Sequence, residues 1–229
     1  MMTLQCIPLS LSNAYLVKGN VNILIDTGSP GEGKQIIRFL HQQGLQLSDL
    51  SLILHTHGHS DHCGSTYELI QYCKIPTALH GGDLIMATSG SNGSVSTTTL
   101  FSKLLLPFVN KPFSPFTPDF LLDEMSDLSR FGLNATIWHT PGHSKGSVSL
   151  ELENGDMVIG DLLMGGMLGG MLLPGRPGYH YFIEDYDSLH RSIEKVLSRP
   201  AKRYWVGHGG PLKAQDVEKW YRRITHRSK

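Results

Sequence analysis

The chain has 229 residues, 40% of them hydrophobic and 17% charged, so it can bury a large core, and we expect one domain spanning residues 1–229. Twenty basic and twenty acidic residues cancel, which gives no support to binding of nucleic acid or of an anionic membrane. No segment reaches the roughly eighteen uninterrupted apolar residues that a membrane span requires.

The N-terminus shows no basic region followed by a long apolar run, so we expect no secretory signal. Three cysteines, Cys6, Cys63 and Cys73, cannot all pair within the chain and show no framework spacing. A reducing compartment is the simpler interpretation. These features together predict a cytoplasmic protein.

Short apolar segments alternate with turn residues at the start of the chain. They predict three strands, over residues 3–9, 13–18 and 21–26. The third strand leads into Asp26 and Gly28. A carboxylate followed by glycine after a strand suits an active-site loop, and a plain Asx turn uses the same residues, so both interpretations stay open. Residues 31–43 carry apolar side chains at helical spacing and predict an amphipathic helix.

The next predicted strand, over residues 51–55, is followed within a few residues by four side chains that can bind a metal ion. These side chains are His57, His59, Asp61 and His62. Imidazole nitrogen and carboxylate oxygen hold borderline divalent ions such as Zn²⁺, and a catalytic zinc keeps one position for water. Residues two apart in an extended segment point the same way, so His57 and His59 can share one ion, and the other two can face a second. The alternative is a polar histidine-rich loop or adventitious metal binding.

Residues 65–73 then predict a helix, and residues 76–80 predict a strand that ends at His80. His80 is either a further ligand at a strand end or a structural histidine. Residues 88–99 are low in complexity and predict irregular structure. The sequence allows three roles for the apolar residues 100–109 and does not separate them. The segment lines a substrate pocket, covers the core, or pairs two subunits of a homodimer.

The second half repeats the pattern of apolar strands followed by glycine-containing loops. Strands are predicted over residues 135–138, 148–152, 157–159 and 204–206, and a helix over residues 186–197. Three potential ligands stand in the loops after strands: His143, Asp161 and His208. Alternating strands and helices predict sheets with helices packed outside and ligands collected where strands end.

The loop 162–181 leaves directly from Asp161, and its methionines and glycines predict an apolar, adaptable wall of the pocket. Its polar residues either recognise a substrate carboxylate or phosphate or belong to an ordinary surface loop. They are Arg176, Tyr179, His180 and Tyr181. We do not assign them to the site.

The whole pattern resembles the metallo-β-lactamase superfamily of hydrolases. The resemblance covers residues 13–211 and rests on five motifs in order: Asp26-Thr27-Gly28, His57-Gly58-His59-Ser60-Asp61-His62, Pro141-Gly142-His143-Ser144, Gly160-Asp161 and Gly207-His208-Gly209. It implies an α+β fold, a four-layer αββα sandwich of two mixed sheets covered by helices, with a dinuclear metal site at one edge. The implied ligands of the first ion are His57, His59 and His143. The implied ligands of the second ion are Asp61, His62 and His208. Asp161 would bridge the two ions, and Asp26 would support the site from behind.

Such a site implies a metal-dependent hydrolase of small molecules. Two divalent ions about 3.5–4 Å apart can share a hydroxide that acts as the nucleophile, lower the pKa of water and polarise a carbonyl or phosphoryl oxygen. We expect Zn²⁺, with Fe or Mn as the other candidates. Counterparts of Asp61 are often given the catalytic role of orienting the hydroxide or carrying a proton to the leaving group. Ser144 and Cys63 are not expected to act as nucleophiles, since histidines that bind ions are not free to act as a base. His55 and His139 are expected to be strand-end or supporting residues.

Within the superfamily the pattern is most similar to the glyoxalase II-like group, which cleaves thioesters such as S-acylglutathione. The chain departs from glyoxalase II at Gly210, where that enzyme has a tyrosine, and lacks its added helical domain with cationic glutathione contacts. A related thioester, a lactone or another ester stays open as substrate, and the presence of Asp161 argues against true β-lactamase activity. Nucleic-acid processing is not expected, because such members carry large added domains or basic arms. The alternatives are a mononuclear Fe persulfide dioxygenase-like oxidoreductase and a non-catalytic metal-binding protein.

Overall fold

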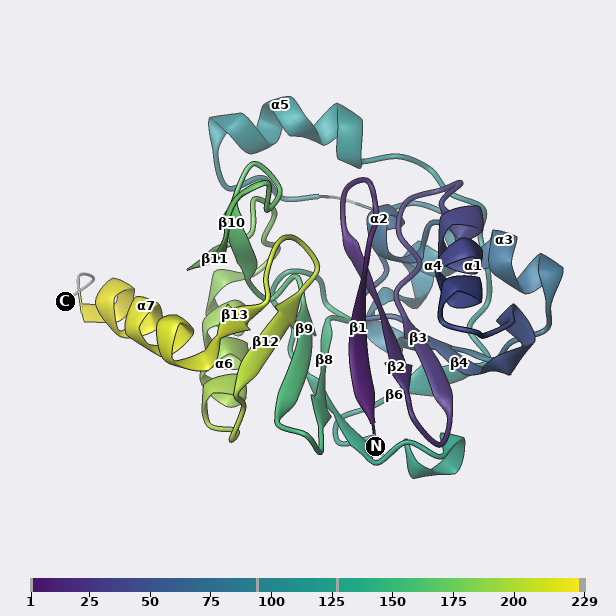
Figure 1. Cartoon of the computed structure of the whole chain (residues 1–229). Coiled ribbons are helices and arrows are strands. Elements are labelled where there is room, and N and C mark those ends of the chain that lie inside the picture. Colours follow the sequence, from purple (N-terminus) through teal and green to yellow (C-terminus); the bar gives the residue numbers. More distant parts are fainter. Residues whose placement is uncertain (1, 94, 127, 227–229) are drawn as a thin grey trace.

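Two β-sheets pack face to face in the computed structural model, which describes residues 2–93, 95–126 and 128–226 (Figure 1). A core cluster lies between the sheets and takes Ile25 and Leu54 from one and Ile137 and Leu150 from the other. Two further clusters lie on the outer faces, where each sheet packs against helices. The resulting order of helix, sheet, sheet and helix confirms the predicted αββα sandwich.

The first sheet holds six strands in sequence order. Their bounds are β1 Thr3–Pro8, β2 Asn13–Lys18, β3 Asn22–Ile25, β4 Leu50–Leu54, β5 Thr77–His80 and β6 Phe120–Leu122. The first three strands form an antiparallel meander, and β3 to β6 run parallel. A parallel neighbour needs a crossover connection, which α1 (Gly33–Gln42) provides between β3 and β4 by burying Ile36 and Leu40 against the sheet.

The second sheet holds five strands in the order β13-β12-β9-β8-β7. Their bounds are β7 Ala135–His139, β8 Val148–Leu152, β9 Asp156–Gly160, β12 Arg203–Val206 and β13 Leu212–Lys213. β9 and β12 are parallel, and α6 (Tyr186–Leu197) forms the crossover between them, as the sequence predicts for residues 186–197. α7 (Ala214–His226) packs beside α6 on the same outer face. α7 was not predicted from the sequence, although Val217, Tyr221 and Ile224 have helical spacing.

Shorter helices follow the strands of the first sheet. Their bounds are α2 Ser60–Cys63, α3 Thr66–Tyr72 and α4 Leu84–Ser89, with 3₁₀ turns at Leu47–Asp49, Gly81–Asp83 and Ser129–Phe131. α3 confirms the helix predicted for residues 65–73. Among the described residues of the low-complexity segment 88–99, regular pairing is confined to one isolated bridge from Thr97 to Phe182.

The segment after Asp161 is a two-stranded hairpin and not the loop expected for residues 162–181. β10 (Met164–Met167) pairs antiparallel with β11 (Leu172–Gly178). The chain reverses through Gly169 and Gly170, both with positive φ, a conformation that glycine adopts at little cost. The glycines that suggested a loop are therefore the residues that allow the hairpin.

Helix α5 (Leu100–Val109) stands apart from the four layers, beside the β10–β11 hairpin (Figure 1). Thr99 caps it, since its hydroxyl accepts a hydrogen bond from the amide of Ser102. Leu100 and Leu104 are exposed on its outer side. In the described parts of the chain, neither α5 nor another helix is long and apolar enough to cross a membrane.

The loops that carry the predicted ligands gather at one edge of the sandwich. They leave β4, β7, β9 and β12 at the ends of these strands. Hydrogen bonds join the two halves there: the amide of Val148 donates to the carbonyl of Thr56 (2.8 Å), and the amide of Asn13 donates to the carbonyl of Gly207 (2.7 Å). The pairing of the two sheets therefore brings distant parts of the sequence to one place.

Candidate metal centre

The histidine-rich motif forms a short turn directly after β4. His57 lies in the non-helical segment, His59 is the N-cap residue of α2 in extended conformation, and Asp61 and His62 belong to the single turn of α2. The three histidines are buried. The change from extended to helical backbone separates the motif into two pairs that face different points, as their spacing predicts.

The first group of side chains consists of His57, His59 and His143. His143 Nε2 lies 2.9 Å from His59 Nδ1 and 3.2 Å from His57 Nε2. Ligand nitrogens of a tetrahedral zinc with Zn–N bonds of about 2.0–2.1 Å are roughly 3.3 Å apart, so this spacing fits one shared ion. Burial lowers the pKa of His59 to about 4 and that of His143 to about 3, which keeps both rings neutral and able to bind a metal.

The second group consists of Asp61, His62 and His208. Asp61 Oδ2 lies 3.4 Å from His208 Nε2 and 3.9 Å from His62 Nε2. Asp61 is 13% exposed, whereas the side chains of the two histidines are 0% and 8% exposed. The carboxylate is therefore the member of this group that is most open to solvent.

Asp161 lies between the two groups at the end of β9. Its Oδ2 is 3.4 Å from Nε2 of both His62 and His143 and 3.2 Å from His208 Nε2. Gly207 packs against this carboxylate so closely that an added Cβ would lie 2.0 Å from Asp161 Oδ1. A side chain at position 207 is therefore incompatible with the position of Asp161.

Hydrogen bonds behind the rings point the inner nitrogens at the site. His208 Nδ1 donates to the carbonyl of Leu11 (2.8 Å), and His143 Nδ1 donates to that of Phe182 (2.8 Å). A histidine that donates one ring N–H to an oxygen has its other nitrogen free to bind a metal. The two rings are thus fixed in the tautomer that a metal ligand needs.

Asp26 supports the site from behind, as the family resemblance implies. Its Oδ2 lies 2.8 Å from His62 Nδ1, and its two oxygens accept hydrogen bonds from the amide and hydroxyl of Thr56. Asp26 has a φ of 61°, a strained conformation for a residue with a side chain, and the carboxylate contacts hold it there. Of the two interpretations left open by the sequence, these contacts with the histidine motif favour the active-site loop.

The carboxylates of the centre raise the pKa of two histidines. Burial lowers the pKa of His62, yet the carboxylates of Asp161, Asp26 and Asp61 together raise it well above its ordinary value. The same competition, in which Asp161 and Asp61 outweigh burial, raises the pKa of His208 to about 10. Carboxylates this buried require positive charge nearby, which protons or metal ions can supply.

Two ring nitrogens that face Asp161 Oδ2, His62 Nε2 and His208 Nε2, are buried and have no hydrogen-bond partner among the described residues. Leaving a polar atom buried and unpaired costs about 1–3 kcal/mol, so such atoms need an explanation. Imidazole nitrogens and a carboxylate oxygen together form the donor set of Zn²⁺ and related divalent ions. The residues present therefore fit a metal centre.

Asp83 joins the two ligand-bearing loops and was not identified from the sequence. Its Oδ2 accepts hydrogen bonds from the amide of Gly58 (2.9 Å) and the hydroxyl of Ser144 (2.6 Å), and its Oδ1 accepts from the amide of Gly146 (2.7 Å). Gly58 lies between two histidines of the motif, and Ser144 follows His143. The sequence gives no spacing that would identify Asp83, because its partners are two backbone amides and a serine hydroxyl of other loops.

His180 is a second side chain near the centre that was not predicted to belong to the site. It is buried, and its Nε2 lies 3.3 Å from Asp161 Oδ2. The amide of Phe182 donates to His180 Nδ1 (3.2 Å). Nδ1 also lies 3.3 Å from the carbonyl of Phe182, and a proton on Nε2 would make His180 a donor to the carboxylate of Asp161. The hairpin that brings His180 back to Asp161 could not be inferred from spacing alone.

Other residues weighed from the sequence lie outside the metal centre. The ring of His80 stacks on His139 at 4.0 Å, which agrees with the interpretation of His80 as a structural histidine. His55 is buried with its Nε2 3.1 Å from the hydroxyl of Thr66, in the supporting position expected.

Neither nucleophile candidate is poised to react. Burial raises the pKa of Cys63 well above its ordinary value, which suppresses the reactive thiolate. The hydroxyl of Ser144 is held by the carboxylate of Asp83. These contacts agree with the expectation that neither residue acts as a nucleophile.

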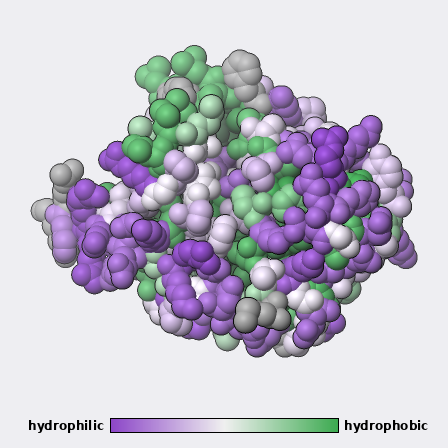
Figure 2. Space-filling view, viewed as in Figure 1, coloured by the Kyte–Doolittle hydropathy of each residue, from purple (hydrophilic) through white to green (hydrophobic). Residues whose placement is uncertain are grey.

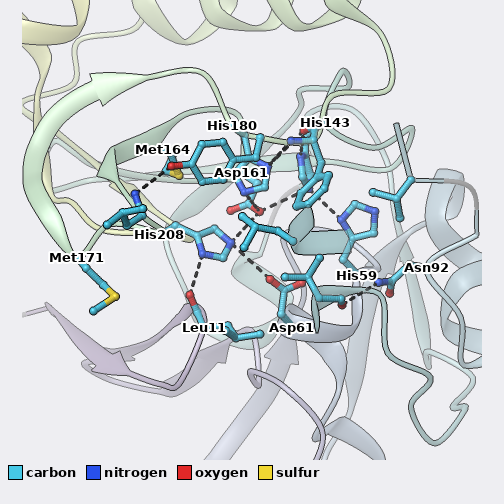
Figure 3. A pocket seen from close by; sticks show the side chains of 17 residues that line it. Leu11, His59, Asp61, Asn92, His143, Asp161, Met164, Met171, His180 and His208 are labelled. Carbon is cyan, nitrogen blue, oxygen red and sulfur yellow. Dashed lines mark hydrogen bonds and ion pairs between the residues drawn. The ribbon is translucent and has the colours of Figure 1, made fainter. Parts of the chain in front are cut away.

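A cavity of about 370 Å³ opens directly above the centre. The side chains of Asp61, His143, Asp161, His180 and His208 point toward one another at its floor (Figure 3). A substrate in this cavity would reach both groups of side chains at once.

A four-layer αββα sandwich with buried histidines and aspartates at one edge defines a class of metal-dependent hydrolases. A sequence model described as the metallo-beta-lactamase superfamily matches residues 7–208, and the chain belongs to this superfamily. A relative from Methanocaldococcus jannaschii, named "Probable metallo-hydrolase", is 33% identical over 202 residues that cover 86% of this chain and 87% of the relative. The chain is accordingly a metallo-hydrolase.

Solved structures show the same fold. The Rm3 metallo-beta-lactamase superposes with a TM-score of 0.73 at 17% identity, covering 98% of this chain and 90% of that one. The protein TTHA1623 in a di-iron-bound form superposes with a TM-score of 0.66 at 29% identity, covering 91% of this chain and 92% of that one. The first likeness concerns the fold alone, because the identity is low.

Proposed function

We propose that this metallo-hydrolase binds two divalent ions and hydrolyses a small-molecule ester, thioester or lactone. The observation that carries the proposal is the position of Asp161, whose Oδ2 lies 3.4 Å from His143 in the first group and 3.2 Å from His208 in the second. A carboxylate between two sets of ligands is arranged to bridge two ions. The proposed ligands are those expected from the sequence: His57, His59, His143, Asp61, His62, His208 and Asp161.

Zn²⁺ is the proposed ion, and iron is the main competitor. Buried imidazole and carboxylate groups suit Zn²⁺, and also Fe or Mn. The relative TTHA1623 was solved in a di-iron-bound form, which supports a two-ion site and keeps iron in consideration here. When bound, two such ions lower the pKa of water toward neutrality and polarise an acyl carbonyl oxygen.

Asp61 is the residue proposed to handle the proton. Hydrolysis adds the elements of water across the acyl C–O or C–S bond, and the leaving oxygen or sulfur must gain a proton. Asp61 lines the cavity and is the most exposed carboxylate of the centre, so it can orient a water molecule and pass a proton to the leaving group. With a proton on Nε2, His180 adds an N–H donor beside Asp161 and can hold a substrate oxygen in place.

The order of the motifs supports placing the enzyme with the glyoxalase II-like group. The experiment that tests the function combines metal analysis with a panel of thioesters, lactones and simple esters on one preparation. We expect two equivalents of metal per chain and metal-dependent hydrolysis within the panel. One iron per chain with oxygen uptake on a persulfide and no ester hydrolysis would instead establish a dioxygenase.

A matched pair of variants separates catalysis from metal binding alone. His59→Ala should abolish hydrolysis and lower the metal content, whereas Asp123→Asn, at an exposed position, should change neither. Two results together would identify a non-catalytic binding protein. Purified, metal-loaded protein would hydrolyse no compound of the panel, and the His59→Ala variant would keep the biological effect of the wild type in its host.

A further inference from the structure

The walls of the cavity differ sharply from its floor. The floor carries the proposed ligands, whereas the walls are hydrocarbon, supplied mainly by Leu11, Val95, Leu105, Val109, Leu168 and Met171. None of the described residues that line the cavity is a lysine or an arginine. The walls therefore offer apolar contact to a substrate and no side-chain cation that could pair with a carboxylate or phosphate.

The cationic residue of the hairpin faces elsewhere. Arg176 lines a separate hollow together with Trp220 and Arg223 of α7, and none of the three lines the cavity above the metal centre. The sequence left open whether Arg176 recognises a substrate anion at the site. Its position beside α7 argues against that role.

Hydrogen bonds fix the apolar walls to the segments that carry the site. The carbonyl of Val109, at the end of α5, accepts from the hydroxyl of Ser60 (3.1 Å), which neighbours Asp61. On the other side, the amide of Leu168 donates to the hydroxyl of Tyr181 (2.9 Å), which neighbours His180. The hydrocarbon walls are thus held in register with the ligands, as a preformed substrate site requires.

The apolar surface continues outward from the cavity. Figure 2 shows hydrophobic residues gathered over α5 and the β10–β11 hairpin. Leu168 and Met171 line the cavity and are also 47% and 83% exposed, so they connect its interior with this outer surface. Methionine adapts its shape to differing apolar ligands, which suits a flexible chain.

We propose that the cavity binds the hydrocarbon chain of an acyl ester or thioester, with the chain along α5 and the hairpin and the acyl carbon at the floor. This inference rests on the proposed hydrolase function and names its substrate class. The cleaved bond would then lie beside Asp61 and Asp161, while the chain runs between Leu105 and Leu168 toward the mouth. Chain length is the property that such walls recognise.

A series of p-nitrophenyl esters from acetate through butyrate to octanoate tests the proposal on the metal-loaded enzyme. We expect kcat/KM to rise about two- to fourfold for each added methylene until the chain fills the cavity. Rates that are equal for all lengths, or that fall with length, would overturn the acyl-chain proposal and leave the hydrolase proposal standing. Failure to cleave any ester would count against the hydrolase proposal instead.

Binding of 1-octanol and 1-butanol, measured by calorimetry on the metal-loaded protein, gives a readout that needs no hydrolysis. The walls should bind octanol at least tenfold more tightly than butanol, and equal affinities would refute the proposal. Leu105→Gln, on the cavity side of α5, should reduce this ratio several-fold. Leu104→Gln, on the exposed side of the same helix, is the matched control and should leave it unchanged.

Discussion

Asp83 offers the sharpest test of how the centre is assembled, because it touches no proposed ligand side chain. Its carboxylate accepts three hydrogen bonds, from Gly58, Ser144 and Gly146, at 2.9, 2.6 and 2.7 Å. These partners belong to the loop of the histidine motif and to the loop of His143. We predict that Asp83→Ala lets the two loops separate and weakens the first ligand group.

The size of the effect follows from the contacts. Each hydrogen bond to a charged acceptor contributes about 1.5–3 kcal/mol, and the contributions are not additive, so we expect a loss of about 3–5 kcal/mol in unfolding free energy. For a chain of this size that loss lowers Tm by about 6–20 °C. Removing a residue that orients metal ligands typically costs about 10- to 100-fold in metal affinity.

The assay is thermal unfolding together with competitive metal titration. Asp83→Asn, which keeps the size and one acceptor oxygen, should show a smaller change in the same direction, and exposed Asp123→Asn should show none. The reasoning would be refuted by an Asp83→Ala variant that keeps wild-type Tm and wild-type affinity for both ions.

Three further outcomes are expected. His143→Ala and His208→Ala should each lower metal content by about one equivalent, and retention of both ions in either variant would contradict the proposed pairing. Because the pKa of His208 is raised to about 10, this ring carries a proton at pH 7 in metal-free protein, and the raised pKa of His62 acts in the same direction, so the second ion should release at least one proton and bind more tightly as pH rises. Calorimetry in buffers of different ionisation enthalpy checks this, and a heat independent of buffer for both ions would exclude it. Gly207→Ala should displace the carboxylate of Asp161 and reduce metal content, since a Cβ there would lie 2.0 Å from its Oδ1; metal content equal to that of the wild type would show that the site adjusts.

The sequence was informative where chemistry is concentrated in local spacing. His57 and His59 stand two apart in an extended segment, and this spacing alone predicts a shared ion. Apolar periodicity likewise predicted α1 and α6, whose buried faces are continuous along the helix. These signals can be recognised in the sequence because they depend only on residues close to one another in the chain.

Contacts between distant loops left no such signal. His180 reaches Asp161 only because β10 and β11 turn the chain back, and the many glycines of that segment are equally typical of a loop. Asp83 follows a strand in the first half and holds Gly146 from the second. Every residue except proline carries a backbone amide N–H, so a carboxylate that accepts hydrogen bonds from amides of remote residues leaves no recognisable pattern in the sequence.

The histidine motif is therefore half of a site, and the packing of the two sheets supplies the rest. His59 reaches its partner His143 only across the interface between the halves, at 2.9 Å. Asp161 joins the two groups there, and Asp83 connects the loop of the histidine motif with the loop of His143. Metal binding should consequently depend on the docking of the halves, since separated loops cannot offer three nitrogens to one ion. The same docking sets the walls of α5 and the hairpin above the ligands, so one packing event forms both the reactive floor and the apolar cavity.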